Sequence, residues 1–443
     1  MRSTFRDHSP PNAGSLRPPL RLDPDSWEVT HQDIEQALEI SSNTKPGPDS
    51  IPYGAWRALG KLAVDILYDV TSTLSQASAP DLLREAYEDE TTDGQHDFNL
   101  STLICLPKKP TGHDDEAGTY FSPGNTRPLS IVNTDNRLIA NAARLRWESI
   151  LDKWISSNQQ GFLPGRSMLS NLVALDTTSM HTALSGPNGA VVLFDFRAAF
   201  PSLAPGFLFQ MLRRIGIPEN AINFVSSLYD NNRCQISYKG DLYPGFTMSG
   251  VRQGCPLSPL LYALAADVLL EKIATSLPEA WVRAYADDTA VVLSDFWSQA
   301  PRLGSIFEAF AKISNLHLNI DKCVLIPLHP RGPQLPAHLS NARPPTQADV
   351  RLRDNAPNPA GDSAERKSGS SNSDKSIDGP NRSEPNSPDS PTTRASTSQT
   401  TTPATRLKQQ MEGALQTLGH NLQQHLWGWR NMKLSGKESI WGS

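Results

Sequence analysis

The chain has 443 residues, long enough for two or three domains and a sizeable core. Its net charge of -5 is unlike the basic balance of many nucleic-acid-binding proteins, so composition alone does not indicate that class. Four widely spaced cysteines without a Cys-x-x-Cys pair favour reduced thiols over a zinc site or a disulfide framework. The first residues lack the apolar core of a signal peptide, and no apolar run could span a membrane. We therefore expect an intracellular protein, nuclear or cytoplasmic, that is neither secreted nor membrane-bound.

The first part of the chain is expected to be an arm followed by helices. Residues 1–30 are polar and proline-rich, which is typical of disorder. A helix is expected from about His31 and another over about 53–75, with the proline- and glycine-rich turn Lys45–Pro52 between them. Residues 84–97 are acidic and polar and predict a loop.

Basic residues stand at the neighbouring ends of two predicted strands. Residues 100–109 read as a strand that ends in Lys108 and Lys109, and Arg127 stands near the start of the next apolar run. A hairpin of these strands could present the three cations to one anion, and the fork of Arg127 suits bidentate contact with a phosphate. A solvated charged loop explains the same residues and is the simpler interpretation in the absence of other motifs.

The middle of the chain alternates predicted helices and one buried strand. An amphipathic helix is expected after Asn133, followed by a turn-rich connector at 159–167 and a helix at 168–183. The continuously apolar run Gly189–Phe196 predicts a fully buried strand. Asp195 stands at its end, where a lone aspartate is usually a cap for the next turn.

A hairpin and a glycine-flanked loop come next. Helices are expected at 207–215 and 304–314, and residues 234–247 read as two short strands around a turn. The loop at 249–259 contains Gln253 and opens a further apolar helix. Such a helix start can receive a planar ligand, although a simple tight turn before a core helix explains it equally well.

Two adjacent carboxylates interrupt the run Ala284–Leu293. Its alternating and β-branched residues predict a hairpin with Asp287 and Asp288 at the turn. Adjacent carboxylates repel unless they are solvated or share a cation, so a divalent-metal site and an ordinary solvated turn are about equally favoured. The metal site gains support from Asp195, a third carboxylate at the end of an apolar strand.

The last part of the chain changes composition. From about residue 330 to 405, Ser, Pro, Thr, Asn, Asp and Arg dominate, which predicts disorder. Residues 406–443 regain apolar residues at helical spacing.

Five motifs in this order resemble a reverse transcriptase, with the closest likeness to non-LTR (LINE-type) retrotransposons. The motifs are Arg127-Pro-Leu-Ser, Phe194-Asp-Phe-Arg-Ala-Ala-Phe, Gly250-Val-Arg-Gln-Gly-Cys-Pro-Leu-Ser-Pro, Tyr285-Ala-Asp-Asp and Leu318-Asn-Ile-Asp-Lys-Cys. The resemblance covers roughly residues 34–326. It implies an α+β right-hand polymerase fold with fingers at 31–188 and a palm with an antiparallel sheet at 189–329. A disordered insert at 330–405 and a truncated, thumb-like helical segment at 406–443 would follow.

The resemblance also implies a role for ten residues. Asp195, Asp287 and Asp288 match the catalytic, metal-binding aspartates of the family, and Phe196 matches a residue whose backbone carbonyl also contacts the metal. The other six match residues that contact the nucleotide. They are Phe200, which blocks a ribose 2′-hydroxyl, Gln253, which packs on the incoming nucleotide and template, Arg127 with Lys108 or Lys109, which hold the triphosphate, and Lys322, which is suggested to protonate the departing pyrophosphate.

The implied activity is RNA-directed DNA polymerisation, a nucleotidyl transfer from dNTPs to a DNA primer on an RNA template. The resemblance implies two Mg²⁺ ions, with Mn²⁺ as a substitute. Three departures from the family favour a catalytically impaired remnant that only binds nucleic acid: no apurinic-type endonuclease precedes residue 31, no primer-gripping hairpin is evident after Lys322, and the thumb-like segment stops. An RNA-dependent RNA polymerase is a third alternative, which Phe200 disfavours.

Overall fold

The structure is a computed structural model that covers most of the chain up to residue 329. Residues 1–16, the expected disordered insert at 330–405 and almost all of the thumb-like segment at 406–443 lie outside the described residues. The described residues are 17–87, 97–115, 118–238, 241–329 and 433–434.

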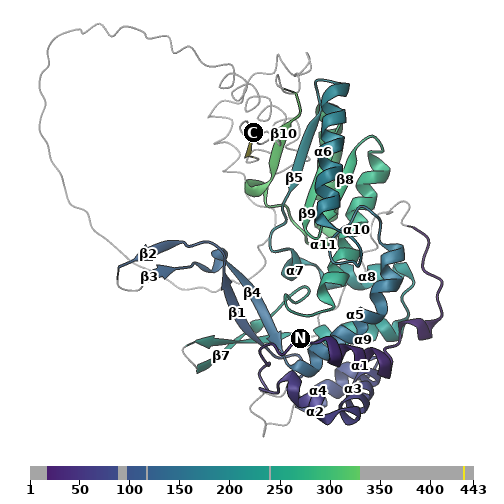
Figure 1. The fold of residues 1–443 in the computed structure, drawn as a ribbon, viewed down its shortest axis with the longest axis vertical. Helices are drawn as coiled ribbons and strands as arrows, with labels where there is room; N and C mark the ends of the chain where they lie inside the picture. Colours follow the sequence, from purple (N-terminus) through teal and green to yellow (C-terminus); the bar gives the residue numbers. More distant parts are fainter. Residues whose placement is uncertain (1–16, 88–96, 116–117, 239–240, 330–432, 435–443) are drawn as a thin grey trace, which may run out of the picture.

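Helices pack around the five-stranded sheet, and a four-stranded sheet projects away from them (Figure 1). None of the described helices is both long and apolar enough to cross a membrane. The helices are α1 (His31–Ile40), α2 (Tyr53–Leu59), α3 (Lys61–Leu74), α4 (Ala79–Tyr87), α5 (Thr134–Trp154), α6 (Met168–Ser185), α7 (Ala199–Ser202), α8 (Pro205–Ile215), α9 (Glu219–Tyr229), α10 (Ser258–Ser276) and α11 (Phe296–Ser314), with the 3-10 turns η1 (Pro24–Trp27), η2 (Pro123–Asn125) and η3 (Ile320–Lys322).

The strands form one five-stranded sheet, one four-stranded sheet and a small hairpin. The five-stranded sheet has the order β11-β10-β5-β9-β8, the four-stranded sheet has the order β4-β1-β6-β7, and β2 pairs with β3. The strands are β1 (Ser101–Pro107), β2 (Gly112–Asp114), β3 (Gly118–Tyr120), β4 (Thr126–Val132), β5 (Ala190–Phe194), β6 (Arg233–Tyr238), β7 (Asp241–Thr247), β8 (Trp281–Tyr285), β9 (Asp288–Leu293), β10 (Val324–Pro327) and β11 (Lys433–Leu434).

The five-stranded sheet is built around β5, which pairs antiparallel with both β9 and β10. Its alternate side chains point to two covered faces. Val191 and Leu193 face α6, whereas Phe194 packs on Phe307 of α11 with ring centroids 4.3 Å apart. Because both faces are covered, the strand reads as a continuous apolar run, and the expected buried strand is confirmed.

The four-stranded sheet extends away from the helices. The β1–β4 hairpin projects as an arm that ends in β2 and β3 (Figure 1). The expected hairpin at 234–247 is confirmed as β6 and β7, and all seven residues of β7 are exposed. This sheet therefore has far less buried surface than the five-stranded one.

Four sequence-based expectations need correction. Residues 17–30 are not a disordered arm, because Trp27 is buried edge-on against Trp147 and its carbonyl accepts a 2.7 Å hydrogen bond from that indole. The expected helix at 53–75 is broken at Gly60, which has a φ of 55°. Helix α4 runs into the expected acidic loop, and α9 was not expected at all. At residues 17–30 a tertiary contact outweighs the local composition, and at Gly60 a backbone break interrupts the helix.

Candidate active site

The turn between β8 and β9 carries the acidic pair. Tyr285 and Asp288 are the last paired residues of the two strands, so Ala286 and Asp287 are the central residues of the turn. Ala286 has a φ of 59°, whereas Asp287 does not have a positive φ. A positive φ at the first central residue only is the pattern of a type II′ turn, which usually has glycine there. The expected hairpin is confirmed, with two neighbouring carboxylates at its tip.

Asp195 follows the central strand β5 and reaches the same tip. The β5–β9 ladder ends with Phe194 opposite Thr289. One step further along both strands, Asp195 comes opposite Asp288. Both Asp287 and Asp288 lie within electrostatic reach of Asp195. The structure therefore brings together the three carboxylates that stand apart in the sequence.

The site is crowded with negative charge. Burial raises the pKa of the Asp287 carboxyl, and the charge of Asp195 raises it further, while Arg127 and Lys322 oppose the shift. Burial also raises the pKa of Asp288, and repulsion from the other two carboxylates adds to it. Lys322 Nζ lies 3.6 Å from Asp195 Oδ2. Such a site favours the binding of a cation.

The chain beyond β5 places Phe196 and Lys322 at the site. Phe196 forms an antiparallel bridge with Leu318, in which the amide of Asn319 donates a 2.7 Å hydrogen bond to the carbonyl of Asp195. The two hydrogen bonds of this bridge use the carbonyl of Asp195 and the amide of Arg197, and neither uses the carbonyl of Phe196. The turn η3 follows at once and carries Lys322, whose side chain is exposed.

Phe200 is held by other aromatic rings. It stacks on Tyr262 of α10, with centroids 4.9 Å apart and planes 9° apart, and meets Phe162 edge-on at 6.0 Å. The hydroxyl of Tyr262 is buried without a hydrogen-bond partner. Burial raises the pKa of Tyr262 well above its usual range, and the charges of Asp287 and Asp288 act in the same direction. The phenol thus links Phe200 to the acidic turn.

The loop that contains Gln253 touches both Phe200 and the four-stranded sheet. Gly250 has a φ of 68°, and a Cβ there would lie 2.4 Å from the carbonyl of Phe200. That carbonyl accepts a 3.0 Å hydrogen bond from the amide of Val251. The carbonyl of Gln253 accepts a 2.8 Å hydrogen bond from the amide of Ser130 in β4. The loop therefore connects α7, which carries Phe200, to the four-stranded sheet.

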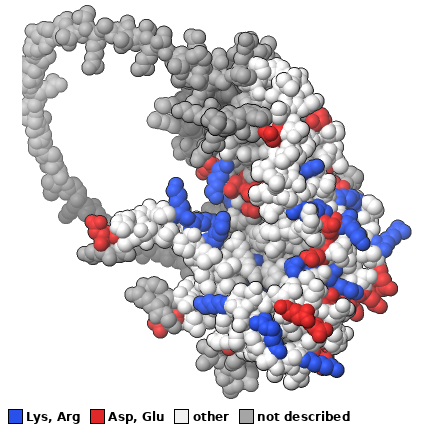
Figure 2. Space-filling model, in the orientation of Figure 1, with Lys and Arg blue, Asp and Glu red and all other residues white. Residues whose placement is uncertain are grey.

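The three basic residues of the arm lie on one ladder. Arg127 pairs with Leu106 of β1, and Lys108 and Lys109 follow the end of that strand. All three cations are exposed. Arg127 lies within electrostatic reach of Asp287. Figure 2 shows Lys and Arg side chains gathered at the base of the arm beside Asp and Glu side chains.

Comparison with known proteins identifies the family. The family model described as "Reverse transcriptase (RNA-dependent DNA polymerase)" matches residues 106–343, more than half of the chain. The chain belongs to this reverse transcriptase family. The predicted resemblance is therefore confirmed, and the α+β fold is a right-hand polymerase fold.

The relatives of this chain include proteins of mobile elements. It is 27% identical to the "Transposon TX1 uncharacterized 149 kDa protein" of Xenopus laevis, over 66% of this chain and 22% of that protein. It is 25% identical to the "Retrovirus-related Pol polyprotein from type-2 retrotransposable element R2DM" of Drosophila melanogaster, over 67% of this chain and 26% of that protein. The chain spans about a quarter of the length of these relatives. A telomerase structure from Candida tropicalis has a TM-score of 0.37 and 15% identity, covering 52% of this chain and 41% of that chain.

The oxygen donors at this site are of the kind that binds a hard divalent cation. Carboxylate and carbonyl oxygens are the ligands that Mg²⁺ prefers, and the crowded aspartates would be relieved by a positive charge. Among the residues that the structure describes, no three His, Cys, Asp or Glu side chains converge closely enough to hold an ion by themselves. Mg²⁺ typically keeps waters and takes substrate phosphates as further ligands. The protein would therefore supply only part of the coordination.

Sequence reasoning missed several residues that shape this site. Tyr262 sits in an apolar helical pattern that gives no sign of its contact with Phe200. Arg252 is 1% exposed and donates a 2.8 Å hydrogen bond to Asn99, which fastens the Gln253 loop to the start of β1. Gln159 lies in a connector where no periodic pattern exists. The only signal in the sequence was polar residues at places where the chain must turn.

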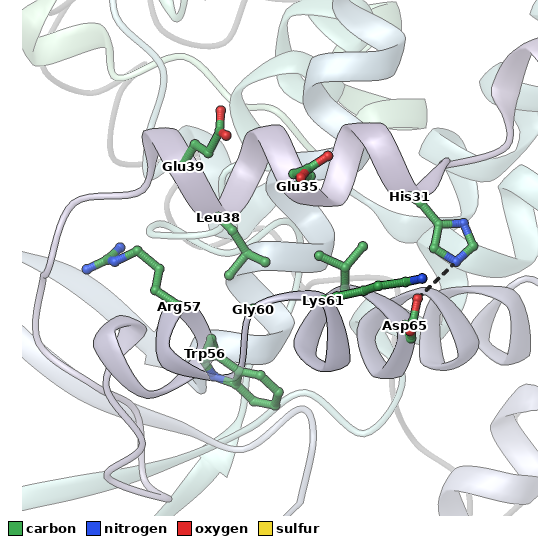
Figure 3. A pocket seen from close by; sticks show the side chains of 10 residues that line it. His31, Glu35, Leu38, Glu39, Trp56, Arg57, Gly60, Lys61 and Asp65 are labelled. Atoms are coloured by element: carbon green, nitrogen blue, oxygen red, sulfur yellow. Dashed lines mark ion pairs between the residues drawn. The ribbon is translucent and has the colours of Figure 1, made fainter.

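A separate cavity of about 520 Å³ lies between α1, α2 and α3 (Figure 3). It is lined by the acidic Glu35 and by the basic Arg57 and Lys61, and His31 Nε2 lies 3.7 Å from Asp65 Oδ1 at one end. The mixed charges give no single-sign field to attract a phosphate. None of the residues expected at the active site lines this cavity.

Proposed function

We propose that this chain is the RNA-directed DNA polymerase domain of a non-LTR retrotransposon, adding deoxynucleotides to a primer 3′-hydroxyl on an RNA template. The observation that carries the proposal is the meeting of Asp195 with the Asp287–Asp288 pair, beside Lys322 and Arg127. Family membership supports it independently. The acid-bearing sheet, apart from β11 at 433–434, corresponds to the proposed palm at 189–329. The cationic arm belongs to the proposed fingers at 31–188, with β6 and β7 interleaved.

The aspartates act as metal ligands in this proposal. Asp195, Asp287 and Asp288 would hold two divalent cations, with the carbonyl of Phe196 as a further oxygen donor. Bound Mg²⁺ or Mn²⁺ would supply charge neutralisation at the attacking and leaving oxygens. Positioning and charge neutralisation dominate phosphoryl transfer, so the rigid support of β5, β8 and β9 is the main contribution of the fold.

The cations act on the triphosphate. Arg127 offers a planar fork to two phosphate oxygens, and Lys108 or Lys109 adds charge on the same ladder. Lys322 lies beside Asp195 and would donate a proton to the departing pyrophosphate. Because a general acid contributes less than the metal ligands, loss of Lys322 should slow the reaction without abolishing it.

Phe200 and Gln253 act on the nucleotide itself. The flat stack of Phe200 on Tyr262 supports a fixed bulky wall where a ribose 2′-hydroxyl would stand. Gln253 is half-buried on a loop that is bonded to α7 and to the four-stranded sheet, which suits a residue that packs on the nucleotide and template. A fixed wall excludes the larger sugar, because the packed rings cannot move away.

The decisive experiment is primer extension with the full chain. Purified protein is given poly(rA)/oligo(dT), dTTP and either Mg²⁺ or Mn²⁺, and the same reaction is run with UTP and with a chelator. We expect metal-dependent addition of dTTP and little addition of UTP. Circular dichroism establishes that each sample is folded.

Each other result selects an alternative. No incorporation by a folded chain that still retains primer–template in a filter-binding assay would favour the impaired remnant that only binds nucleic acid. Equal or preferred use of UTP would favour an RNA polymerase. Incorporation that persists in the chelator would contradict the two-metal proposal.

A further inference from the structure

The connector between α5 and α6 runs beside the edge strand of the acid-bearing sheet. Gln159 forms a parallel bridge with Ala284 of β8. The amide of Ala284 donates to the carbonyl of Asn158, and the amide of Gln160 donates to the carbonyl of Ala284, each at 2.8 Å. A Cβ at Gly161 would lie 2.2 Å from the amide nitrogen of Ala286, so only glycine fits this close approach. The connector is therefore pressed against the acidic turn.

The side chain of Gln159 forms hydrogen bonds with both backbone polar groups of one residue of that turn. Its Oε1 accepts a 2.9 Å hydrogen bond from the amide of Ala286, and its Nε2 donates a 3.1 Å hydrogen bond to the carbonyl of Ala286. The same Oε1 accepts a 2.9 Å hydrogen bond from the amide of Gly161. Gln159 is fully buried. Every polar atom of this side chain is thus engaged at the base of the acidic turn.

Ala286 needs such support because of its backbone. Its φ of 59° lies in a region that alanine rarely adopts, and it immediately precedes Asp287. Residues held in sparsely populated conformations persist only where their surroundings enforce them, and they gather at functional sites. The amide of Gln159 satisfies both backbone groups of the strained residue, so other turn conformations would leave buried polar groups unpaired.

We propose that Gln159 is a positioning residue, which holds Ala286 in the left-handed conformation and thereby fixes the direction of the Asp287 and Asp288 carboxylates. This inference rests on the proposed polymerase function for its catalytic consequence. Gln159 does not touch the substrate, and it acts only through the turn. Its loss should therefore lower kcat and leave the KM for dTTP nearly unchanged.

The test compares two neighbouring glutamines in the full chain. Gln159→Met keeps the length of the side chain but removes its hydrogen bonds, and we expect kcat to fall about 10- to 100-fold, as misplacement of reacting groups by about 1 Å can do. Gln160→Met is the matched control, because the side chain of Gln160 bonds to Ser157 and Ser167 and not to the acidic turn. It should retain kcat within about twofold.

A double-mutant cycle separates positioning from general loosening. Glycine adopts a positive φ without strain, so Ala286→Gly should make the turn less dependent on Gln159. In that background, we expect the loss of kcat caused by Gln159→Met to shrink by about fivefold or more. Equal losses in both backgrounds would contradict the proposal, since a purely structural role elsewhere in the protein would not depend on Ala286.

Amide hydrogen exchange gives a readout that does not need activity. In Gln159→Met, peptides that cover 284–290 and 158–163 should exchange faster, whereas peptides from α8 should be unchanged. If the wild-type chain extends no primer, the proposed function fails, and the exchange result alone then decides whether Gln159 holds the turn. Unchanged exchange at 284–290, or faster exchange without any change in kcat in an active chain, would overturn the proposal.

Discussion

The two main sheets of the molecule meet at one site but are built in opposite ways. In the five-stranded sheet, Val191 and Leu293 are fully buried, and helices cover both faces of the strands that carry the acids. In the four-stranded sheet, Leu242 and Tyr243 are each 47% exposed, and Arg127 stands on an open ladder. The acids therefore sit on a packed scaffold, and the cations sit on an arm with little core of its own.

The difference follows from what each kind of residue must do. Carboxylates that share a cation must keep a fixed separation, and only a packed support can hold them against their mutual repulsion. A cation that binds a triphosphate needs solvent access and reach, which an exposed hairpin provides. If this comparison is right, changes in the five-stranded sheet should damage chemistry or folding. Changes in the four-stranded sheet should weaken binding.

The largest expected effect is at Asp195. Asp195→Asn removes one metal-binding charge from the packed sheet and should lower primer extension by about 10³-fold or more. Asp241→Asn, the same change on an exposed residue of β7, should leave extension within about twofold. Rates are measured by single-nucleotide extension at saturating dTTP. Similar rates for Asp195→Asn and the wild-type chain would remove the basis for assigning chemistry to this sheet.

The next largest effect compares two leucines of the two sheets. Leu293→Ala in β9 leaves a cavity at a fully buried position and should lower the free energy of unfolding by about 3 kcal/mol. Leu242→Ala in β7 removes a half-exposed side chain and should change it by about 0.5 kcal/mol or less. Urea unfolding followed by circular dichroism gives both values. Equal losses of unfolding free energy in the two variants would mean that the four-stranded sheet contributes as much to the hydrophobic core as the five-stranded one.

Phe200 lies in α7, which the Gln253 loop joins to the four-stranded sheet. Phe200→Ala removes the ring that stacks on Tyr262 and should raise the relative use of UTP over dTTP by about 100-fold. Tyr262→Phe keeps the stack and loses only an unpartnered hydroxyl, so sugar selection should stay the same. Competition between the two nucleotides on poly(rA)/oligo(dT) measures the ratio. Unchanged selection in Phe200→Ala would count against this role.

A smaller effect is expected on the arm. Arg127→Ala should raise the KM for dTTP by about 10-fold, with little change in kcat or in the melting temperature, because an exposed charge-assisted contact is lost. Arg127→Lys keeps the charge but loses the planar fork of the guanidinium. Its KM for dTTP should lie between those of the wild-type chain and Arg127→Ala. A fall in kcat with unchanged KM would instead place Arg127 with the chemistry of the packed sheet.

The strands that carry the acids could be predicted from local patterns, whereas the roles of Asp195, Asp287 and Asp288 in one site came from the resemblance to a reverse transcriptase. A continuous apolar run ending in Asp195 and an alternating run around Asp287 gave both strands and the hairpin. The supports of the turn could not be predicted in the same way. Gln159 lies in a connector without periodicity, and Tyr262 occupies a place that any large apolar residue would fit. Gln159 acts on a residue 127 positions away, and Tyr262 stacks on Phe200, which lies far outside its own helix; local patterns do not encode such contacts.

The same limit applies to the packing of the N-terminal residues. The polar, proline-rich composition of residues 17–30 predicted disorder, but a single aromatic residue decides the outcome. Trp27 buries a large surface against α5, enough to order its neighbours. Arg17 strengthens the attachment through a 2.9 Å ion pair with the buried Asp267. Composition averages over a segment, whereas burial is decided by individual side chains.

The smallest effect concerns Asp135, at the junction where β4 passes into the core helix α5. Burial raises the pKa of this carboxyl to about 6, and the charge of Asp49 adds to the shift, against the hydrogen bond that it accepts from the amide of Asn136. The unfolded value is about 3.9, so the native state holds more protons between about pH 4 and pH 6. Stability is therefore fullest below about pH 4 and is lost as the pH rises through about 6.

Asp135→Asn removes this dependence, because the amide stays neutral at every pH. The variant should be more stable than the wild-type chain by about 1 kcal/mol at pH 7.5. This difference is smaller than the full pKa shift of Asp135 would give, because the side chain is only half-buried and solvent screens its charge. The difference should vanish near pH 4, where the wild-type carboxyl is protonated. Urea unfolding at the two pH values measures it. A variant that is less stable at pH 7.5 would show that the charge helps the start of α5 more than burial penalises it, and the junction would then resemble the exposed arm more than the packed sheet.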